Sequence, residues 1–83
     1  MAMRRLKILD SFANDVLDGS KSFELRYNDR NYQRGDYVKF VVVGEDGDRQ
    51  AHPLNDVLFR VVYVLGGWGL KDGYVALGLK KCV

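Results

Sequence analysis

The chain has 83 residues, of which 47% are hydrophobic and 29% are charged, and its net charge is +2. This length suits one domain with a single core, and the weak basic excess does not indicate a general nucleic-acid-binding surface. No apolar run reaches the roughly 18 residues that a membrane-spanning helix needs, and no export signal is visible. The lone cysteine, Cys82, excludes an internal disulfide. We therefore expect one domain over residues 1–83, in the cytoplasm and without a membrane partner.

A short strand and a short helix are predicted at the start of the chain. Residues 4–8 alternate between polar and apolar and predict the first strand. Asp10 or Ser11 is expected to cap a helix, because both side chains accept hydrogen bonds from free backbone N–H groups. Gly19 is expected to end this helix, since a left-handed residue often stands there. Apolar residues recur between these points at helical spacing: Phe12, Ala13, Val16 and Leu17.

The remainder of the chain is rich in strand patterns separated by turn residues. Four further strands are predicted at residues 22–27, 37–43, 57–65 and 74–79. The segment 37–43 is rich in β-branched and aromatic residues, so we expect it to be central. A sheet of five or six strands cannot be covered on both faces by one or two short helices in so short a chain. The expected fold is therefore mostly β (α+β), a small curled antiparallel β-barrel with a helix at one end.

The most informative segment lies where the predicted helix ends. It has the pattern G-x-K-x-x-E-x-R, followed by an Asn-Asp-Arg turn, and its residues are Gly19, Lys21, Glu24, Arg26 and Arg30. Because side chains alternate along a strand, Glu24 and Arg26 share one face and Phe23, Leu25 and Tyr27 the other. The pattern concentrates ionisable groups on one strand face. It predicts a binding face for a small ligand or a nucleotide.

This pattern resembles the ASCH domain of the PUA-like β-barrel superfamily. A closer resemblance is to a small bacterial and phage family of unknown function, domain-of-unknown-function family 3850. The likeness runs along nearly the whole chain, through Leu6-Lys7-Ile8, Phe12, Val16, Gly19 to Arg30, Gly35-Asp36, Tyr63-Val64 and Gly69 to Gly78. The resemblance implies a PUA-like barrel and RNA binding. It also implies an enzymatic alternative, because some ASCH members are amidohydrolases that act on acetylated cytidine.

Each candidate residue has a role that its chemistry supports. Lys21 is expected to contact a phosphate as a point charge, and Arg26 to fork onto a phosphate or a base edge. Glu24 is expected to accept from an exocyclic amine. Arg30 extends the basic rim, and Trp68, in a glycine-rich loop, is expected to cover the ligand. Each residue also has a structural alternative. Glu24 and Arg26 would form an exposed ion pair worth about 0–1 kcal/mol. Arg30 would belong to a turn, and Trp68 would be a packed aromatic ring.

The leading hypothesis is a non-enzymatic module that binds RNA or a nucleotide-like small ligand in a cleft lined by Lys21, Glu24, Arg26 and Arg30. Arg26→Ala is then expected to weaken binding and leave the melting temperature nearly unchanged. A second hypothesis is a small hydrolase of acylated nucleosides with Lys21 and Glu24 as the acid–base pair. A third is a phage or mobile-element accessory protein that binds another protein. No metal-ligand spacing or cofactor motif is present, so neither a metal nor a cofactor is expected.

Overall fold

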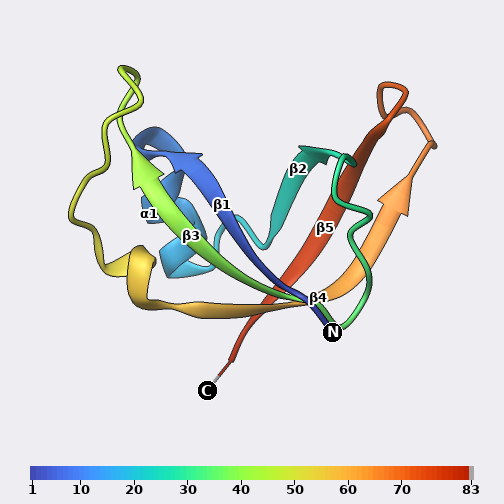
Figure 1. Ribbon diagram of the computed structural model, residues 1–83, viewed down its shortest axis with the longest axis horizontal. Helices are drawn as coiled ribbons and strands as arrows, with labels where there is room; N and C mark the ends of the chain where they lie inside the picture. The colour runs from blue at the N-terminus through green and yellow to red at the C-terminus, as the bar shows by residue number, and fades with distance from the viewer. Residues whose placement is uncertain (83) are drawn as a thin grey trace.

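The computed structural model describes residues 1–82, and strands dominate this part of the chain (Figure 1). The elements in chain order are β1 (Met3–Leu9), α1 (Asp10–Asp18), β2 (Phe23–Tyr27), β3 (Tyr37–Val43), the 3-10 helix η1 (Pro53–Asp56), β4 (Leu58–Gly66) and β5 (Tyr74–Lys81). The predicted mostly-β class is confirmed. The predicted strand positions are also confirmed, with ends that differ by at most two residues.

The strands form one mixed sheet in the order β1-β3-β4-β5-β2. β1 pairs with β3 in parallel, with Met3 opposite Tyr37, and the other three pairings are antiparallel. The sheet is therefore not purely antiparallel. The chain passes through α1 and β2 between β1 and β3, which gives the long crossover that a parallel pair requires. β3, the most apolar strand, lies between two others, as its composition predicts.

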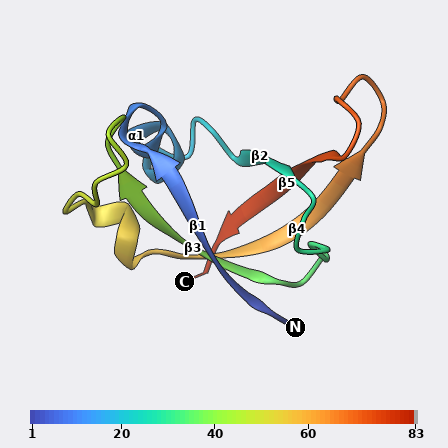
Figure 2. The ribbon, with the colours of Figure 1, turned by 45° about the horizontal axis from the view of Figure 1, so that its top comes forward.

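The sheet bends sharply, so that its strands form two arms (Figures 1 and 2). One arm holds β1 and β3 with α1 beside them, and the other holds β5 with the second half of β4. The bend coincides with an irregularity of β4, whose pairing with β5 shifts register between Val61 and Tyr63. Such a bulge bends its strand and increases its twist. The carbonyl of the bulged Val62 accepts a hydrogen bond from Arg34 Nε at 3.0 Å.

The core fills the inside of this bend. The largest fully buried side chains come from α1, β3, η1, β4 and β5: Phe40, Leu54, Leu77, Val16, Val38, Val42 and Val61. The rings of Phe40 and Phe59 pack edge to face with centroids 5.6 Å apart. Burial of such side chains, at about 1.5–3 kcal/mol each, is the main stabilising contribution in a domain of this size.

Helix α1 covers one end of the core through its buried residues Ala13 and Val16. The predicted end at Gly19 is confirmed, because this residue has a left-handed φ of 90°. The predicted cap is wrong. Leu9 precedes the first helical residue and makes no capping hydrogen bond through its side chain, whereas Asp10 lies inside the first turn. A carboxylate in the first turn still favours the positive end of the helix dipole.

The two end strands of the sheet, β1 and β2, face each other without pairing. Ala2 O accepts from Tyr37 N, so in the alternating pattern the backbone groups of Arg5 and Lys7 point away from β3. On β2, Asn28 N donates to Gly73 O, so the backbone groups of the odd-numbered residues point away from β5. We call this space between the unpaired edges of β1 and β2 the seam. The curled sheet is thus not closed by a hydrogen-bonded ladder.

Candidate functional site

The charged face of β2 points into the fold and its apolar face points outward. The carboxylate residue Glu24 is only 6% exposed, whereas Phe23, Leu25 and Tyr27 are 44–58% exposed. A half-buried strand normally has the opposite arrangement, with its apolar side chains inside. The sequence predicts that ionisable groups share one face. The structure adds that this face is the buried one, where an ionised group must be paired to be tolerated.

Glu24 is paired on both sides. Its Oε1 lies 3.5 Å from Lys21 Nζ, and its Oε2 accepts from Arg26 Nε at 3.0 Å. The cationic side chains remain partly accessible, at 20% for Lys21 and 25% for Arg26. Three of the predicted site residues are therefore brought together as a single ionic cluster. The buried carboxylate fixes the two cations while their remaining N–H donors stay within reach of solvent or a ligand.

Arg26 also reaches across the seam. Its Nη2 donates to the backbone carbonyl of Lys7 on the unpaired edge of β1. One guanidinium thus connects the two end strands of the sheet and pairs with Glu24 at the same time. The planar fork of arginine suits such a double role, since its donors have a fixed geometry.

A pocket of about 530 Å³ opens at this position in the seam. It is lined by Lys7, Ile8, Leu9, Phe12, Lys21, Phe23, Glu24, Leu25 and Arg26. We call this space the seam pocket. Its volume lies within the range of roughly 300–1,000 Å³ that small-molecule sites occupy. Its walls are mostly apolar and its polar groups converge at the ionic cluster, which is the usual composition of a ligand site.

Two phenylalanine rings flank the ammonium group of Lys21. The Nζ atom lies 4.3 Å from the centroid of Phe12 and 5.5 Å from that of Phe23. Each residue is 44% exposed, so each ring has a free surface beside the cluster. The sequence analysis missed both residues. Phe12 belonged to a predicted apolar helix stripe and Phe23 to the predicted apolar face of a strand, and both patterns are typical of core residues.

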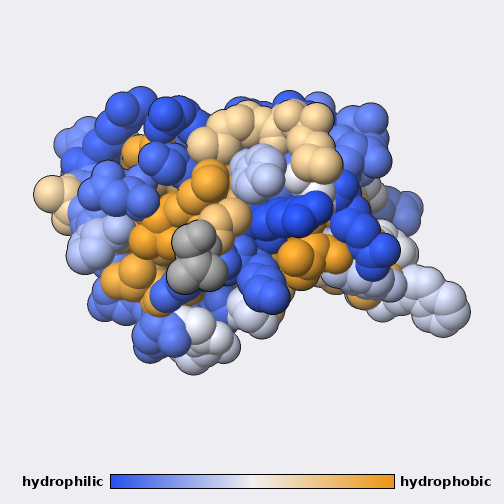
Figure 3. Space-filling model, turned by 90° about the horizontal axis from the view of Figure 1, so that it is seen from below, coloured by the Kyte–Doolittle hydropathy of each residue, from blue (hydrophilic) through white to orange (hydrophobic). Residues whose placement is uncertain are grey.

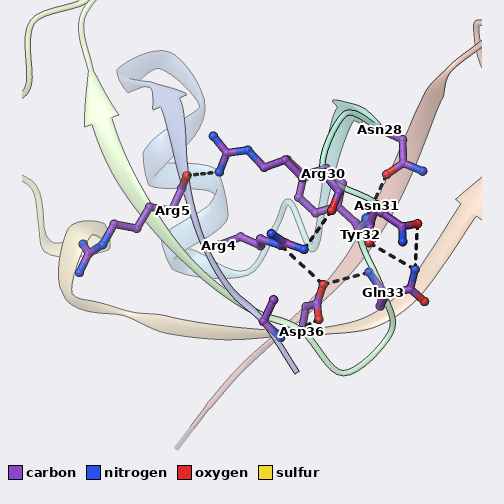
Figure 4. A network of polar contacts seen from close by, with 9 residues as sticks. Arg4, Arg5, Asn28, Arg30, Asn31, Tyr32, Gln33 and Asp36 are labelled. Atoms are coloured by element: carbon purple, nitrogen blue, oxygen red, sulfur yellow. Dashed lines mark hydrogen bonds and ion pairs between the residues drawn. The ribbon is translucent and has the colours of Figure 1, made fainter.

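Arg30 lies outside the seam pocket, in a different network (Figure 4). Its Nη1 donates to Arg5 O at 3.3 Å, and its own carbonyl accepts from Arg4 Nη2 at 2.9 Å. Arg4 in turn lies 3.8 Å from the buried carboxylate of Asp36. These contacts tie the segment between β2 and β3 to the unpaired edge of β1. The structure therefore gives Arg30 a position on the seam, but next to Arg5 and not beside Lys21.

Trp68 is also remote from the ionic cluster. It lies in the connection between β4 and β5, is 91% exposed and has a positive φ of 53°. It does not line the seam pocket. Its predicted role as a cover for the ligand therefore has no supporting contact in the structure. That role stays a prediction for a bound state.

Comparison with known proteins identifies the family. A family model described as "Domain of unknown function (DUF3850)" matches residues 3–79. The chain belongs to this family. The match covers almost all of the chain and confirms the closer resemblance drawn from the motifs. No curated protein sequence is similar to the chain.

A solved structure has a fold similar to that of this DUF3850 domain. Its title is "Crystal structure of hypothetical protein PH0355", and its TM-score to the chain is 0.61 at 14% sequence identity. The similarity covers 99% of this chain and 100% of the other one. At this identity the likeness concerns the fold alone.

The described residues contain no group of three or more His, Cys, Asp or Glu side chains arranged to hold a metal ion. Over residues 1–82, no helix is long and apolar enough to cross a membrane.

Proposed function

We propose that this DUF3850 domain is a binding module for a nucleotide-like ligand, including a nucleotide of an RNA chain, and that the ligand occupies the seam pocket. The observation that carries the proposal is the buried Glu24 carboxylate between Lys21 and Arg26. A buried charge is costly, and a fully apolar residue at this position would pack without that cost. An ionic cluster at the base of an accessible pocket is therefore more typical of a site than of a core.

The charge of the pocket suits an anionic ligand. Three cations line it, on Lys7, Lys21 and Arg26, against the single anion Glu24. This leaves an excess of two positive charges. Lys21 would contact a phosphate as a point charge, and the free edge of the Arg26 guanidinium would donate in a fork. In this reading Glu24 positions the two cations, because both of its oxygens already face them.

The aromatic rings suit the base of a nucleotide. Phe12 and Phe23 both lie near the Lys21 ammonium group, and both residues are partly exposed. A base that stacks on such a ring gains about 1–3 kcal/mol. The unpaired backbone groups of β2 provide donors and acceptors for the edge of the base. The pocket thus offers one kind of contact to the phosphate and another to the base.

A titration with small ligands tests this proposal. We expect uridine 5′-monophosphate to bind more tightly than uridine, because the nucleoside lacks the phosphate. Lys21→Gln should weaken binding of the monophosphate by about tenfold, which corresponds to roughly 1.4 kcal/mol. Lys71→Gln is the matched control, because this exposed lysine lies between β4 and β5 and does not line the seam pocket. If both variants bind the monophosphate with equal affinity, and thermal melts show that both are folded, the seam pocket is not the site of the nucleotide.

One contact also favours a second candidate function, the hydrolase of acylated nucleosides. Lys21 and Glu24, the predicted acid–base pair, do lie in contact at 3.5 Å. However, the second oxygen of Glu24 accepts a hydrogen bond from Arg26, so both carboxylate oxygens already have a cationic partner. Incubation with N4-acetylcytidine and chromatography of the products distinguishes the two functions. Deacetylation by the wild type that is lost in Lys21→Gln would establish the hydrolase, and unchanged substrate would leave the binding module.

A further inference from the structure

A second pocket, of about 440 Å³, adjoins the first at Lys21. It lies where the end of α1 meets the end of β5, and its charged lining residues are Asp18, Lys21, Lys80 and Lys81. We call it the terminal pocket. Lys21 lines both pockets, so this one side chain stands between them. Nothing in the site described above uses the terminal pocket.

The two pockets together concentrate the positive charge of the molecule. Their lining contains five cationic residues and two anionic ones, a net charge of +3. The whole chain carries +2, so all other residues together carry −1. Although the net charge of the chain is weak, the residues that line the two pockets are therefore clearly basic. A basic groove that follows the backbone is what single-stranded nucleic acids require of their binding proteins.

The lysines of the terminal pocket are not equivalent. Lys81 Nζ donates to the carbonyl of Leu17 in the last turn of α1, and so serves the helix end, which contains no basic residue of its own. Asp18 accepts from both the backbone and the hydroxyl group of Ser20. Lys80 is exposed and lines the pocket. Among the charged residues of the terminal pocket, Lys80 is therefore the one whose charge is most accessible to a ligand.

The surface on this side of the molecule is mixed in character. Seen from below, hydrophilic residues surround a stretch of apolar ones (Figure 3). The terminal pocket itself combines the buried apolar residues Phe59 and Leu79 at its base with lysines at its rim. This combination resembles that of the seam pocket, but without exposed aromatic rings to stack on a base.

From this arrangement we infer that the two pockets form one path for a single strand of nucleic acid. One nucleotide occupies the seam pocket with its base against Phe12 or Phe23, Lys21 contacts the linking phosphate, and the next phosphate lies in the terminal pocket near Lys80. The inference rests on the proposed function and extends it from a mononucleotide to a strand. It predicts that affinity depends on the length of the ligand and that Lys80 contributes only to longer ligands.

The test compares 5′-phosphorylated uridine mono-, di- and trinucleotides, by calorimetry at two salt concentrations. We expect the trinucleotide to bind on the order of tenfold more tightly than the mononucleotide, because the second contact is made within one ligand. Lys80→Gln should reduce the affinity for the trinucleotide several-fold and lower its salt slope by about 0.7, the value for one phosphate contact on a single strand. The same variant should bind the mononucleotide as the wild type does. Lys71→Gln should leave both affinities unchanged.

The possible failures are distinguishable. If the mononucleotide binds through Lys21 but the trinucleotide binds no more tightly, the path is refuted and the seam pocket remains a nucleotide site. If Lys80→Gln and Lys71→Gln behave alike with the trinucleotide, the terminal pocket plays no part and the path is likewise refuted. If neither ligand binds, or if Lys21→Gln leaves the affinity for the mononucleotide unchanged, the proposed function is refuted together with the path.

Discussion

Replacing Arg26 by methionine tests whether the seam is held by side chains. Methionine keeps much of the apolar stem of arginine but removes the guanidinium group. The variant loses the ion pair with Glu24 at 3.0 Å and the hydrogen bond to the carbonyl of Lys7. A hydrogen bond to a charged group contributes about 1.5–3 kcal/mol when it is well shielded. The Arg26 side chain is 25% exposed, so we take the lower part of this range for the two contacts together.

We therefore expect Arg26→Met to lower the free energy of unfolding by about 2 kcal/mol, with a fall in melting temperature of about 8–16 °C for a domain of this size. Differential scanning calorimetry measures both. The matched control is Arg49→Met, at an exposed arginine between β3 and η1. The expectation differs from the one drawn from sequence, in which loss of Arg26 weakens binding alone. Equal melting temperatures for the two variants would refute the reasoning and return Arg26 to a role in ligand contact only.

Three further variants test other parts of the structure. Asp36→Asn should lower the free energy of unfolding by about 2 kcal/mol in urea denaturation, because one oxygen that accepts from a backbone N–H becomes a donor in a site only 3% exposed. Gly73→Ala should destabilise by more than about 1 kcal/mol, since its φ is 82° and the new Cβ would lie 2.6 Å from the ring of Tyr27; an unchanged melting curve would contradict this. The hydrogen bonds from Ser20 lower the pKa of Asp18, so this carboxylate stabilises the fold above its ordinary pKa and ceases to do so as the pH falls through the lowered value. Ser20→Ala should raise the pKa of Asp18 in an NMR titration, and an unaltered titration would assign the shift to another cause.

Much of the fold was predictable from local patterns. The run of β-branched residues over 37–43 predicts β3 without ambiguity, and Gly19 marks the end of α1 because few other residues adopt a positive φ. The helix start was harder. Asp10 and Ser11 have the right chemistry for a cap, but the chain enters the helix directly from β1, so Leu9 occupies the capping position. The sequence contains no signal for that continuity, which is set by the pairing of β1 with β3.

The candidate site was predictable in part. The alternation of β2 correctly groups Glu24 with Arg26, because strand geometry fixes which side chains share a face. Alternation does not say which face is buried, and the apolar side chains of Phe23 and Leu25 favour the wrong answer. In the folded chain the charged face of β2 makes a contact across the seam to Lys7, which lies far away in sequence. Phe12 joins the candidate site only through tertiary folding, so no local pattern points to it.

The occupied carbonyl groups on β1 have a consequence for contacts between molecules. A free strand edge offers a row of backbone groups to which a strand of another chain can add, and this is a common route to aggregation. Here the carbonyls of Arg5 and Lys7 already accept from Arg30 and Arg26. An incoming strand would have to displace both guanidinium groups and then bury their charges or expel them into solvent. The arginines thereby protect an edge that the open sheet would otherwise leave available for intermolecular pairing.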